Sequence, residues 1–212
     1  MNGPVKRRYD SSRRQEQARD TRRRILSAAH DLFVTRGYGR TTIADVAAEA
    51  GVAPETVYSA FKNKPALLHR TWDVTVGGDD RDVPMLERPE LRALFAEPDL
   101  RARFTAFAVF NTAAMRRTAR LHVAVRGAAA RDPAAAAMLA EIDRQRLESM
   151  AGHATAAAAT GQLAVSEEEC RDVLWSTTDG TLWQQLVEGR GWSDERYGAW
   201  LGRLWVASFV VA

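Results

Sequence analysis

A short segment of the chain carries polar side chains whose types and spacing suit contact with DNA. After Pro54 the sequence places a carboxylate, three hydroxyls and an ammonium group in succession: Glu55, Thr56, Tyr58, Ser59 and Lys62. Such groups hydrogen-bond base edges and phosphate oxygens. At helical spacing they fall on one face, as a helix lying in a major groove requires. The pattern therefore predicts a base-reading helix that begins at Pro54.

A second short helix, predicted over residues 43–50, must hold this face in place. Thr42 suits its N-cap, and Asp45 completes an acidic variant of the capping box. Gly51 supplies the turn, and Pro54 suits the first position of the next helix because it lacks an N–H. Four apolar residues are expected to pack the two helices together: Ala47, Val52, Val57 and Phe61. We interpret the pair as a helix-turn-helix.

The stretch TTIADVAAEAGVAPETVYSAFKNKPALL, residues 41–68, resembles the helix-turn-helix of the TetR/AcrR family of bacterial transcription regulators. The similarity extends over residues 20–70. Two positions depart from the family pattern: Ala53 replaces a capping serine, and Pro65 stands where glutamate is frequent. The resemblance implies backbone contacts from Tyr58 and Lys64, with Glu55, Thr56 and Ser59 near bases. The full set of predicted DNA contacts is Arg22, Arg23, Thr41, Thr42, Pro54, Glu55, Thr56, Tyr58, Ser59, Lys62 and Lys64.

The N-terminal residues are strongly basic. Residues 1–19 include six Lys/Arg with few apolar residues, so we expect a disordered arm that either follows phosphates and the minor groove or is merely solvated. A helix is predicted from Asp20 or Thr21 to Arg36, ended by Gly37. Its first turn would contain Arg22, Arg23 and Arg24. Cations there oppose the helix dipole, so we expect phosphate as their partner, or else simple exposure.

The charge is distributed unevenly along the 212 residues. Residues 1–75 hold 14 Lys/Arg against 8 Asp/Glu, whereas the remaining residues hold 16 against 19. A polyanion such as DNA should therefore meet only the first part. One cysteine, Cys170, excludes an internal disulfide framework, and no signal peptide or membrane-spanning segment is evident. We expect a cytoplasmic protein without a membrane partner.

The rest of the chain predicts a larger helical domain. Residues 77–89 are rich in Gly, Asp and Pro, so we place the boundary there: an arm over 1–19, a DNA-binding domain with connecting helix over 20–76, and a second domain over 77–212. Helices are expected near 88–96, 99–118, 120–131, 133–159, 167–188 and 194–211. With almost no strand signal, the predicted fold class is all-α.

The second half more loosely resembles the ligand-binding domain of an actinobacterial TetR-like subgroup. The stretches that carry the resemblance are RTARLHVAVRGAAARDP, EIDRQRL, DVLWSTTDGTLWQQLV and EGRGWSDERYGAWL. It implies that the last two long helices pair with those of a second subunit. The apolar stripes on those helices agree with a homodimer, whose two reading helices would meet a palindromic operator.

A ligand cavity in this domain is a second expectation, with an unknown small molecule as its occupant. The candidate lining residues are Phe104, Phe107, Phe110, Asn111, Met115, His122, Trp175, Asp179 and Trp183. An aromatic and methionine stripe at helical spacing is more often plain core, and His122 alone is more often a structural histidine. The two tryptophans could instead line the dimer seam.

Catalytic and metal-binding patterns are absent from the sequence. The four histidines are isolated, and no HExxH, CxxC, G-x-S-x-G or phosphate-loop pattern occurs. The run Glu167–Glu169 follows Ser166 and indicates a capped helix start. We therefore expect no enzyme activity, cofactor or metal ion, and predict a homodimeric repressor released by a ligand. The alternatives are a poorly selective architectural DNA-binding protein, or a helical carrier or enzyme for an apolar molecule.

Overall fold

The fold is all-α, as the sequence predicts. The structure is a computed structural model that describes residues 5–78 and 88–211, with side chains from residue 13 onward. These residues form helices and turns, apart from one isolated bridge between Leu163 and Val210. Among the same residues, no helix is long and apolar enough to span a bilayer.

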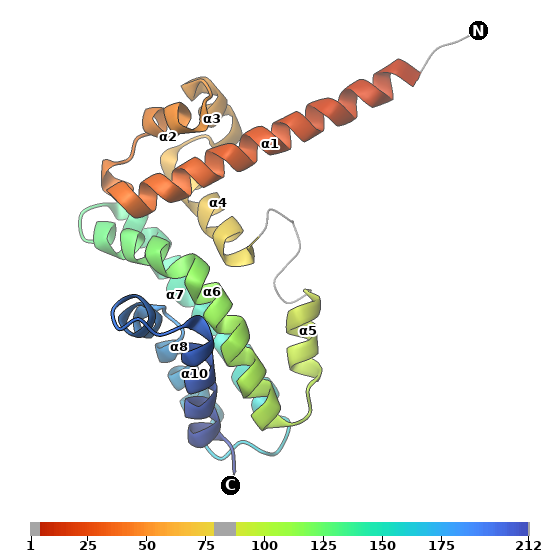
Figure 1. Cartoon of the computed structure of the whole chain (residues 1–212), viewed down its shortest axis with the longest axis vertical. Helices are drawn as coiled ribbons and strands as arrows, with labels where there is room; N and C mark the ends of the chain where they lie inside the picture. Colours follow the sequence, from red (N-terminus) through yellow and green to blue (C-terminus); the bar gives the residue numbers. More distant parts are fainter. Residues whose placement is uncertain (1–4, 79–87, 212) are drawn as a thin grey trace.

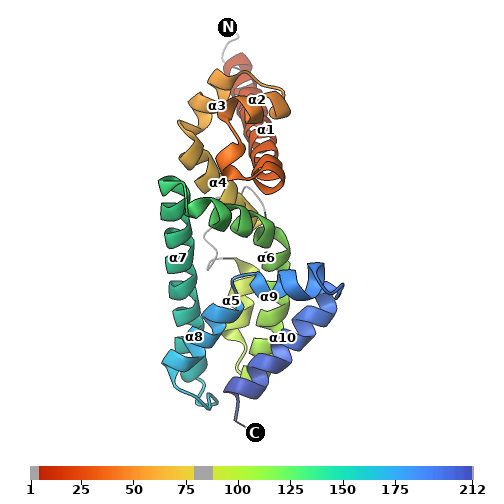
Figure 2. The ribbon, with the colours of Figure 1, turned by 90° about the vertical axis from the view of Figure 1, so that its left-hand side faces the viewer.

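Four helices form the N-terminal part: α1 (Val5–Arg36), α2 (Ile43–Ala50), α3 (Pro54–Phe61) and α4 (Lys64–Gly77), with a 3-10 turn η1 (Tyr38–Arg40) after α1. The bounds of α2 and the start of α3 agree with those predicted. Gly51 adopts φ 65°, the left-handed conformation that the turn between them requires. The short helices α2 and α3 lie across α1, and α4 leads toward the second part (Figures 1 and 2).

The first helix begins earlier than the sequence predicts. It starts at Val5, so residues 5–19 are helical, and the structure does not reproduce a disordered arm over them. Arg22, Arg23 and Arg24 consequently lie in the middle of α1, away from the positive end of its dipole, and the predicted dipole penalty does not apply to them. The physical reason is that residues 5–36 contain neither Gly nor Pro. The side chains of Lys6, Arg7 and Arg8 lie outside the described residues.

The second part contains α5 (Pro89–Ala96), α6 (Leu100–Ala129), α7 (Pro133–Ala158), α8 (Glu167–Thr177), α9 (Thr181–Trp183), a π-helical segment η3 (Gln184–Glu188) and α10 (Asp194–Phe209). Helices α6 and α7 run antiparallel through its centre, α8 packs on α7, and α10 packs on α6 (Figure 2). Ser166 caps α8 by accepting a hydrogen bond from the Glu169 N–H, as the glutamate run indicates.

Two predicted helix bounds in this part are wrong. Helix α6 is continuous across residue 119 and passes through Gly127, since one helical glycine costs only about 1 kcal/mol and packing on both sides offsets it. The helix expected over 167–188 is instead interrupted at Gly180, which has φ 84°. A Cβ built on Gly180 would lie 3.1 Å from the Ala119 Cβ, so the chain turns where it approaches α6 most closely.

The apolar core does not divide at the predicted domain boundary. One cluster of buried residues joins α1–α4 to the adjoining ends of α6 and α7, where Leu121, Val125 and Ile142 take part. A second cluster fills the space between α5, α6, α7, α8 and α10. The connecting helix α4 therefore packs directly on the second part.

Candidate functional site

The helix-turn-helix is fixed by local hydrogen bonds. The Thr42 hydroxyl oxygen accepts from the Asp45 N–H at 3.1 Å, while the Thr42 N–H donates to the Asp45 carboxylate at 2.8 Å. Both halves of the predicted capping box are present. The Thr42 hydroxyl also donates to the Asp45 carboxylate at 2.6 Å, and this bond, together with that from the Thr42 N–H, lowers the pKa of Asp45. Ala53 supplies no side-chain cap to α3, and Pro54 and Glu55 occupy the first turn instead.

Helix α3 separates an apolar face from a polar one. Val57 and Phe61 are buried, with exposed fractions of 0% and 4%. The side chains of Glu55, Thr56, Tyr58 and Ser59 are exposed, and Tyr58 retains 52% of its surface. Pro54 and Lys62 are exposed at the two ends. The helix thus presents a polar surface that no described residue covers.

The turn after α3 is strained. Lys62 has φ 66° and ψ −51°, and the Asn63 N–H donates to the Phe61 carbonyl at 2.7 Å across it. This is a γ-turn with positive φ, a rare conformation for a residue that carries a Cβ. Asn63 then caps α4 by accepting from the Ala66 N–H at 2.9 Å. The turn places Lys62 beside the polar face of α3.

Lys64, at the start of α4, already has an aromatic partner. Its ammonium lies 4.1 Å from the centre of the Tyr38 ring, a cation–π contact. Partial burial lowers the pKa of Lys64, and Asp132 acts in the opposite sense. A phosphate contact by this ammonium stays a prediction.

The predicted contacts outside α3 have different surroundings. The Arg22 guanidinium lies 5.0 Å from the centre of the Phe61 ring, beside the reading helix, and Arg23 pairs with Asp20 at 3.4 Å. Thr42 is exposed. Thr41 is 1% exposed, and its hydroxyl donates to the carbonyls of Leu32 and Gly37. The structure corrects our expectation for Thr41, because its hydroxyl holds the domain together and is not available to DNA.

This domain matches a known family in sequence. Residues 25–71 match the family described as "Bacterial regulatory proteins, tetR family". The helix-turn-helix region is therefore similar to the N-terminal domain of the TetR family. It is 43% identical over 61 residues to the HTH-type transcriptional regulator TtgR of Pseudomonas putida, and 33% identical over 60 residues to AcrR of Shigella flexneri. The aligned part covers only 29% and 28% of those relatives, so both matches concern the N-terminal domain.

Solved structures resemble the fold of almost the whole chain. A candidate transcriptional regulator of Saccharomonospora viridis, in complex with choline, superposes with a TM-score of 0.65 at 21% identity over 90% of this chain and 98% of its own. The SmeT–triclosan complex gives 0.62 at 24% identity, covering 90% and 92%. NalD, the secondary repressor of the MexAB-OprM multidrug efflux pump in Pseudomonas aeruginosa, gives 0.65 at 16% identity, covering 91% and 98%. These likenesses show the fold.

A cavity of about 270 Å³ lies where α4, α6 and α7 meet. Four residues named from the sequence line it: Asn111, Met115, His122 and Asp179. Other lining residues were not predicted from the sequence, among them Trp72 and Val76 on α4 and Ile142, Arg146 and Met150 on α7. The sequence does contain a signal for Arg146: it lies four residues after Ile142 and four before Met150, so it places a charge on the apolar face of this helix.

The other predicted lining residues lie elsewhere. Phe104 packs on Phe209, and Phe107 stacks on His153 with ring centres 3.9 Å apart, so both belong to the core. Phe110 packs half-buried against the same cluster. The indole N–H of Trp183 donates to Asp194 at 2.8 Å, and that of Trp175 donates to the Asp143 carbonyl at 3.3 Å. These five residues do not line the cavity.

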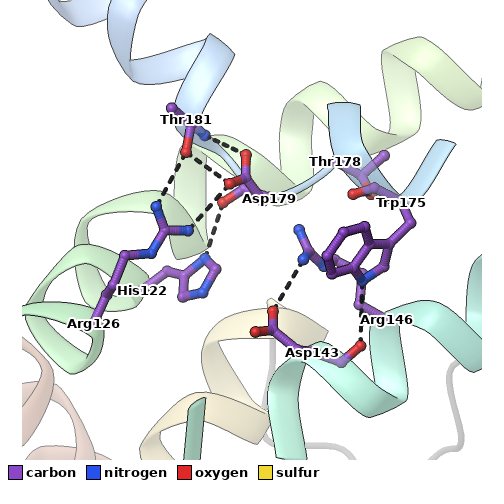
Figure 3. A network of polar contacts seen from close by, with 8 residues as sticks. All are labelled: His122, Arg126, Asp143, Arg146, Trp175, Thr178, Asp179 and Thr181. Carbon is purple, nitrogen blue, oxygen red and sulfur yellow. Dashed lines mark hydrogen bonds and ion pairs between the residues drawn. The ribbon is translucent and has the colours of Figure 1, made fainter. Parts of the chain in front are cut away.

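Polar residues gather at one end of the cavity (Figure 3). The Asp179 carboxylate accepts from Arg126 at 3.1 Å and from the Thr181 hydroxyl at 2.7 Å. Burial would raise the pKa of Asp179, but these hydrogen bonds hold it below its usual value. His122 Nδ1 lies 2.9 Å from the Asp179 carbonyl oxygen. Burial lowers the pKa of His122, so the ring is neutral at pH 7.

The end of α4 is held by arginines from the second part. Arg117 of α6 donates to the carbonyls of Thr75 and Val76 at 3.2 and 3.0 Å. Arg88 donates to the Gly77 carbonyl at 2.6 Å. The Trp72 ring meets His122 edge-on, with centres 5.8 Å apart. One face of the cavity is therefore built on the helix that continues from the helix-turn-helix.

Proposed function

We propose that the protein is a DNA-binding transcription regulator that grips a palindromic operator as a homodimer. The observation that carries the proposal is the exposed polar face of α3, with Glu55, Thr56, Tyr58 and Ser59, within a domain of the TetR family. A helix with a buried apolar side and a free polar side can enter a major groove. Repression, relieved by a small molecule, is the outcome we propose for this chain.

We propose that the dimer forms through the C-terminal helices. Apolar side chains of this region remain only half-buried in the single chain: Val173, Leu182, Leu186, Trp200 and Leu204. A second copy would cover them. A twofold axis would then place the two α3 helices on successive turns of DNA, about 34–36 Å apart.

The effector would act through α4. Trp72 and Val76 line the cavity, and the same helix begins one residue after the turn at Asn63. A ligand that fills the space between α4, α6 and α7 favours one position of α4 over another. The factor by which the ligand lowers the affinity for DNA can be at most the ratio of its own affinities for the two arrangements, and DNA must weaken ligand binding by the same factor.

The first experiment is selection of bound sites from a random DNA library with the full chain at about 150 mM salt, where screening leaves mainly specific contacts. We expect enrichment of inverted half-sites at a fixed spacing. Loss of binding between about 50 and 200 mM salt without any enriched motif would instead favour a sequence-blind architectural protein. Absence of DNA binding would favour a carrier of an apolar molecule and contradict the proposal.

A further inference from the structure

The cavity between α4, α6 and α7 contains buried polar atoms without partners. Among the described residues, no hydrogen-bond partner is found for Asn111 Nδ2, for His122 Nε2, or for Nε and Nη1 of Arg146. All three residues line the cavity. A buried polar atom without a partner is costly, so a group in the cavity that pairs with these atoms would gain much of that free energy back.

The unpaired Nε and Nη1 of Arg146 require a hydrogen-bond acceptor on the ligand. Its side chain is 14% exposed, and only Nη2 reaches a carboxylate, that of Asp143 at 3.0 Å. Arginine remains cationic even when burial lowers its pKa, as it does here. Two N–H groups of a guanidinium in a partly dry cavity suit a planar oxyanion, because such pairs form charge-assisted bonds.

His122 defines a second requirement. Its Nδ1 faces a backbone carbonyl, which can only accept, so Nδ1 carries the hydrogen of the neutral ring. Nε2 then presents a lone pair and needs a donor. The charged groups around the ring are Arg126 on α6, Arg146 and Asp143 on α7, and Asp179, while α4 contributes the uncharged Trp72.

The remaining walls indicate size and shape. The lining between the polar ends is apolar, with Trp72, Met115, Ile142 and Met150. Asn111 and His122 lie eleven residues apart on α6, about 16 Å along its axis, so the cavity is elongated. Its volume of about 270 Å³ lies just below the usual range of about 300–1,000 Å³ for ligand pockets.

We propose that this cavity binds a small, elongated apolar carboxylic acid, whose acid group and one bound proton lie between Arg146 and His122. The inference rests on the proposed function only in treating this cavity as the effector site. One carboxylate oxygen accepts from Arg146. The other carboxylate oxygen and His122 Nε2 share one proton, which is taken from solvent. Binding therefore consumes one carboxylate anion and one proton. A quaternary ammonium ligand is disfavoured, because the cationic side chain of Arg146 lines the cavity and would repel it.

The test uses octanoate, its neutral amide octanamide, and choline as probes of the full chain. Calorimetry in two buffers of different ionisation enthalpy measures affinity and proton uptake together. We expect octanoate to bind about tenfold or more tightly than octanamide, since only the acid gains the charge-assisted bonds. About one proton should be taken up, and the dissociation constant for octanoate should rise about tenfold per pH unit between pH 7 and 8. Octanamide binding should not change with pH.

Two variants locate the effect. Arg146→Met should remove the preference for octanoate while leaving octanamide binding, which also reports that the cavity is intact. Arg144→Met is the matched control, because Arg144 lies on the same helix but is exposed and pairs with Glu141 and Glu148. It should retain the preference.

Several results would overturn the assignment of a carboxylic acid. They are no binding of octanoate, equal or tighter binding of octanamide or choline, or an acid preference that survives Arg146→Met. Release of operator DNA by a neutral or cationic molecule would leave the proposed function standing and remove this inference. If the chain takes up a proton on binding octanoate but binds no DNA, the ligand assignment stands and the proposed function is contradicted.

Discussion

At the scale of single residues, we expect the polar positions on α3 and at the start of α4 to divide into positions that read bases and positions that contact phosphates. Thr56 lies on the exposed face without a role in packing, whereas Lys64 lies at the start of α4 against Tyr38. Phosphate contacts act equally on all sequences, but a contact to a base edge acts on one position of the operator. The two kinds of contact can therefore be separated by measurement.

We predict that Lys64→Met weakens binding to all DNA sequences and that Thr56→Val changes sequence preference. The first substitution removes one cation, so the slope of log affinity against log salt should fall by about 1. The second keeps the side-chain shape and should lose about 1–3 kcal/mol of discrimination at one base pair. Fluorescence anisotropy titrations at several salt concentrations measure both. Wild-type binding by Lys64→Met would remove Lys64 from the interface.

Buried histidines make stability depend on pH. Burial, with a smaller effect from the charge of Arg103, lowers the pKa of His153 to about 4, against an ordinary value of 6.5. The ring stacks between Phe95 and Phe107, with centres 4.7 and 3.9 Å away. Because the unfolded chain binds this proton more readily, the free energy of unfolding should fall as pH drops from 6.5 to 4 and should be unaffected above 6.5.

The expected loss attributable to His153 is on the order of 3 kcal/mol across that range. His153→Phe should flatten the profile, since phenylalanine has no proton to gain. Urea unfolding at pH 4, 5, 6.5 and 7.5 measures it. His122 has a lowered pKa as well and should leave some slope in the variant. An unchanged profile would mean that His153 is not buried as described.

At the scale of elements, the sequence predicts best what local hydrogen bonds decide. The bounds of α2 and α3 follow from Thr42, Asp45, Gly51 and Pro54, whose roles depend only on near neighbours. The early start of α1 agrees with the absence of Gly and Pro over residues 5–36. The continuity of α6 and the interruption before α9 depend instead on how segments far apart pack, for which the sequence has no direct signal. Arg146 interrupts an apolar stripe of α7, which the sequence does show, but only the meeting of α4, α6 and α7 reveals what its side chain faces.

The interruption at Gly180 can be tested through two glycines. Gly180→Ala should destabilise the chain, because φ is 84° and the new Cβ would lie 3.1 Å from Ala119. Gly191 has φ 70° but no atom within 4 Å of an added Cβ among the described residues, so Gly191→Ala isolates the backbone cost. We expect about 1 kcal/mol for Gly191→Ala and about 2–4 kcal/mol for Gly180→Ala. Thermal unfolding followed by circular dichroism measures the difference in stability between the two variants. An equal loss of stability in both would show that α6 shifts at Ala119 to make room for the new Cβ.

At the scale of the whole molecule, the two proposed activities share one helix. Helix α4 begins directly after the turn at Lys62 and Asn63, lines the cavity with Trp72 and Val76, and ends on hydrogen bonds from Arg117. The first apolar core also crosses from the N-terminal helices into α6 and α7. We expect a shift of α4 in one chain to move α3 with it, and a dimer to convert two such shifts into a change in half-site spacing.

The dimer can be tested with Leu204→Glu. Leu204 is half-buried on α10, so a carboxylate there should repel a second copy while remaining hydrated in the single chain. We expect sedimentation as a 23.5 kDa species with unchanged helical circular dichroism. Binding to an inverted repeat should fall by about 100-fold or more, because each half-site is then held alone.

Leu147→Glu is the matched control for this substitution. Leu147 is an exposed apolar residue on α7, 39% exposed and outside α8–α10. The variant should stay dimeric and keep its affinity for the inverted repeat, because its new carboxylate is hydrated in either state. A Leu204→Glu chain that sediments as a dimer would place the interface on another face. A monomer that still binds the inverted repeat at wild-type affinity would instead separate DNA reading from dimerisation, and the twofold arrangement of the two α3 helices would have to be abandoned.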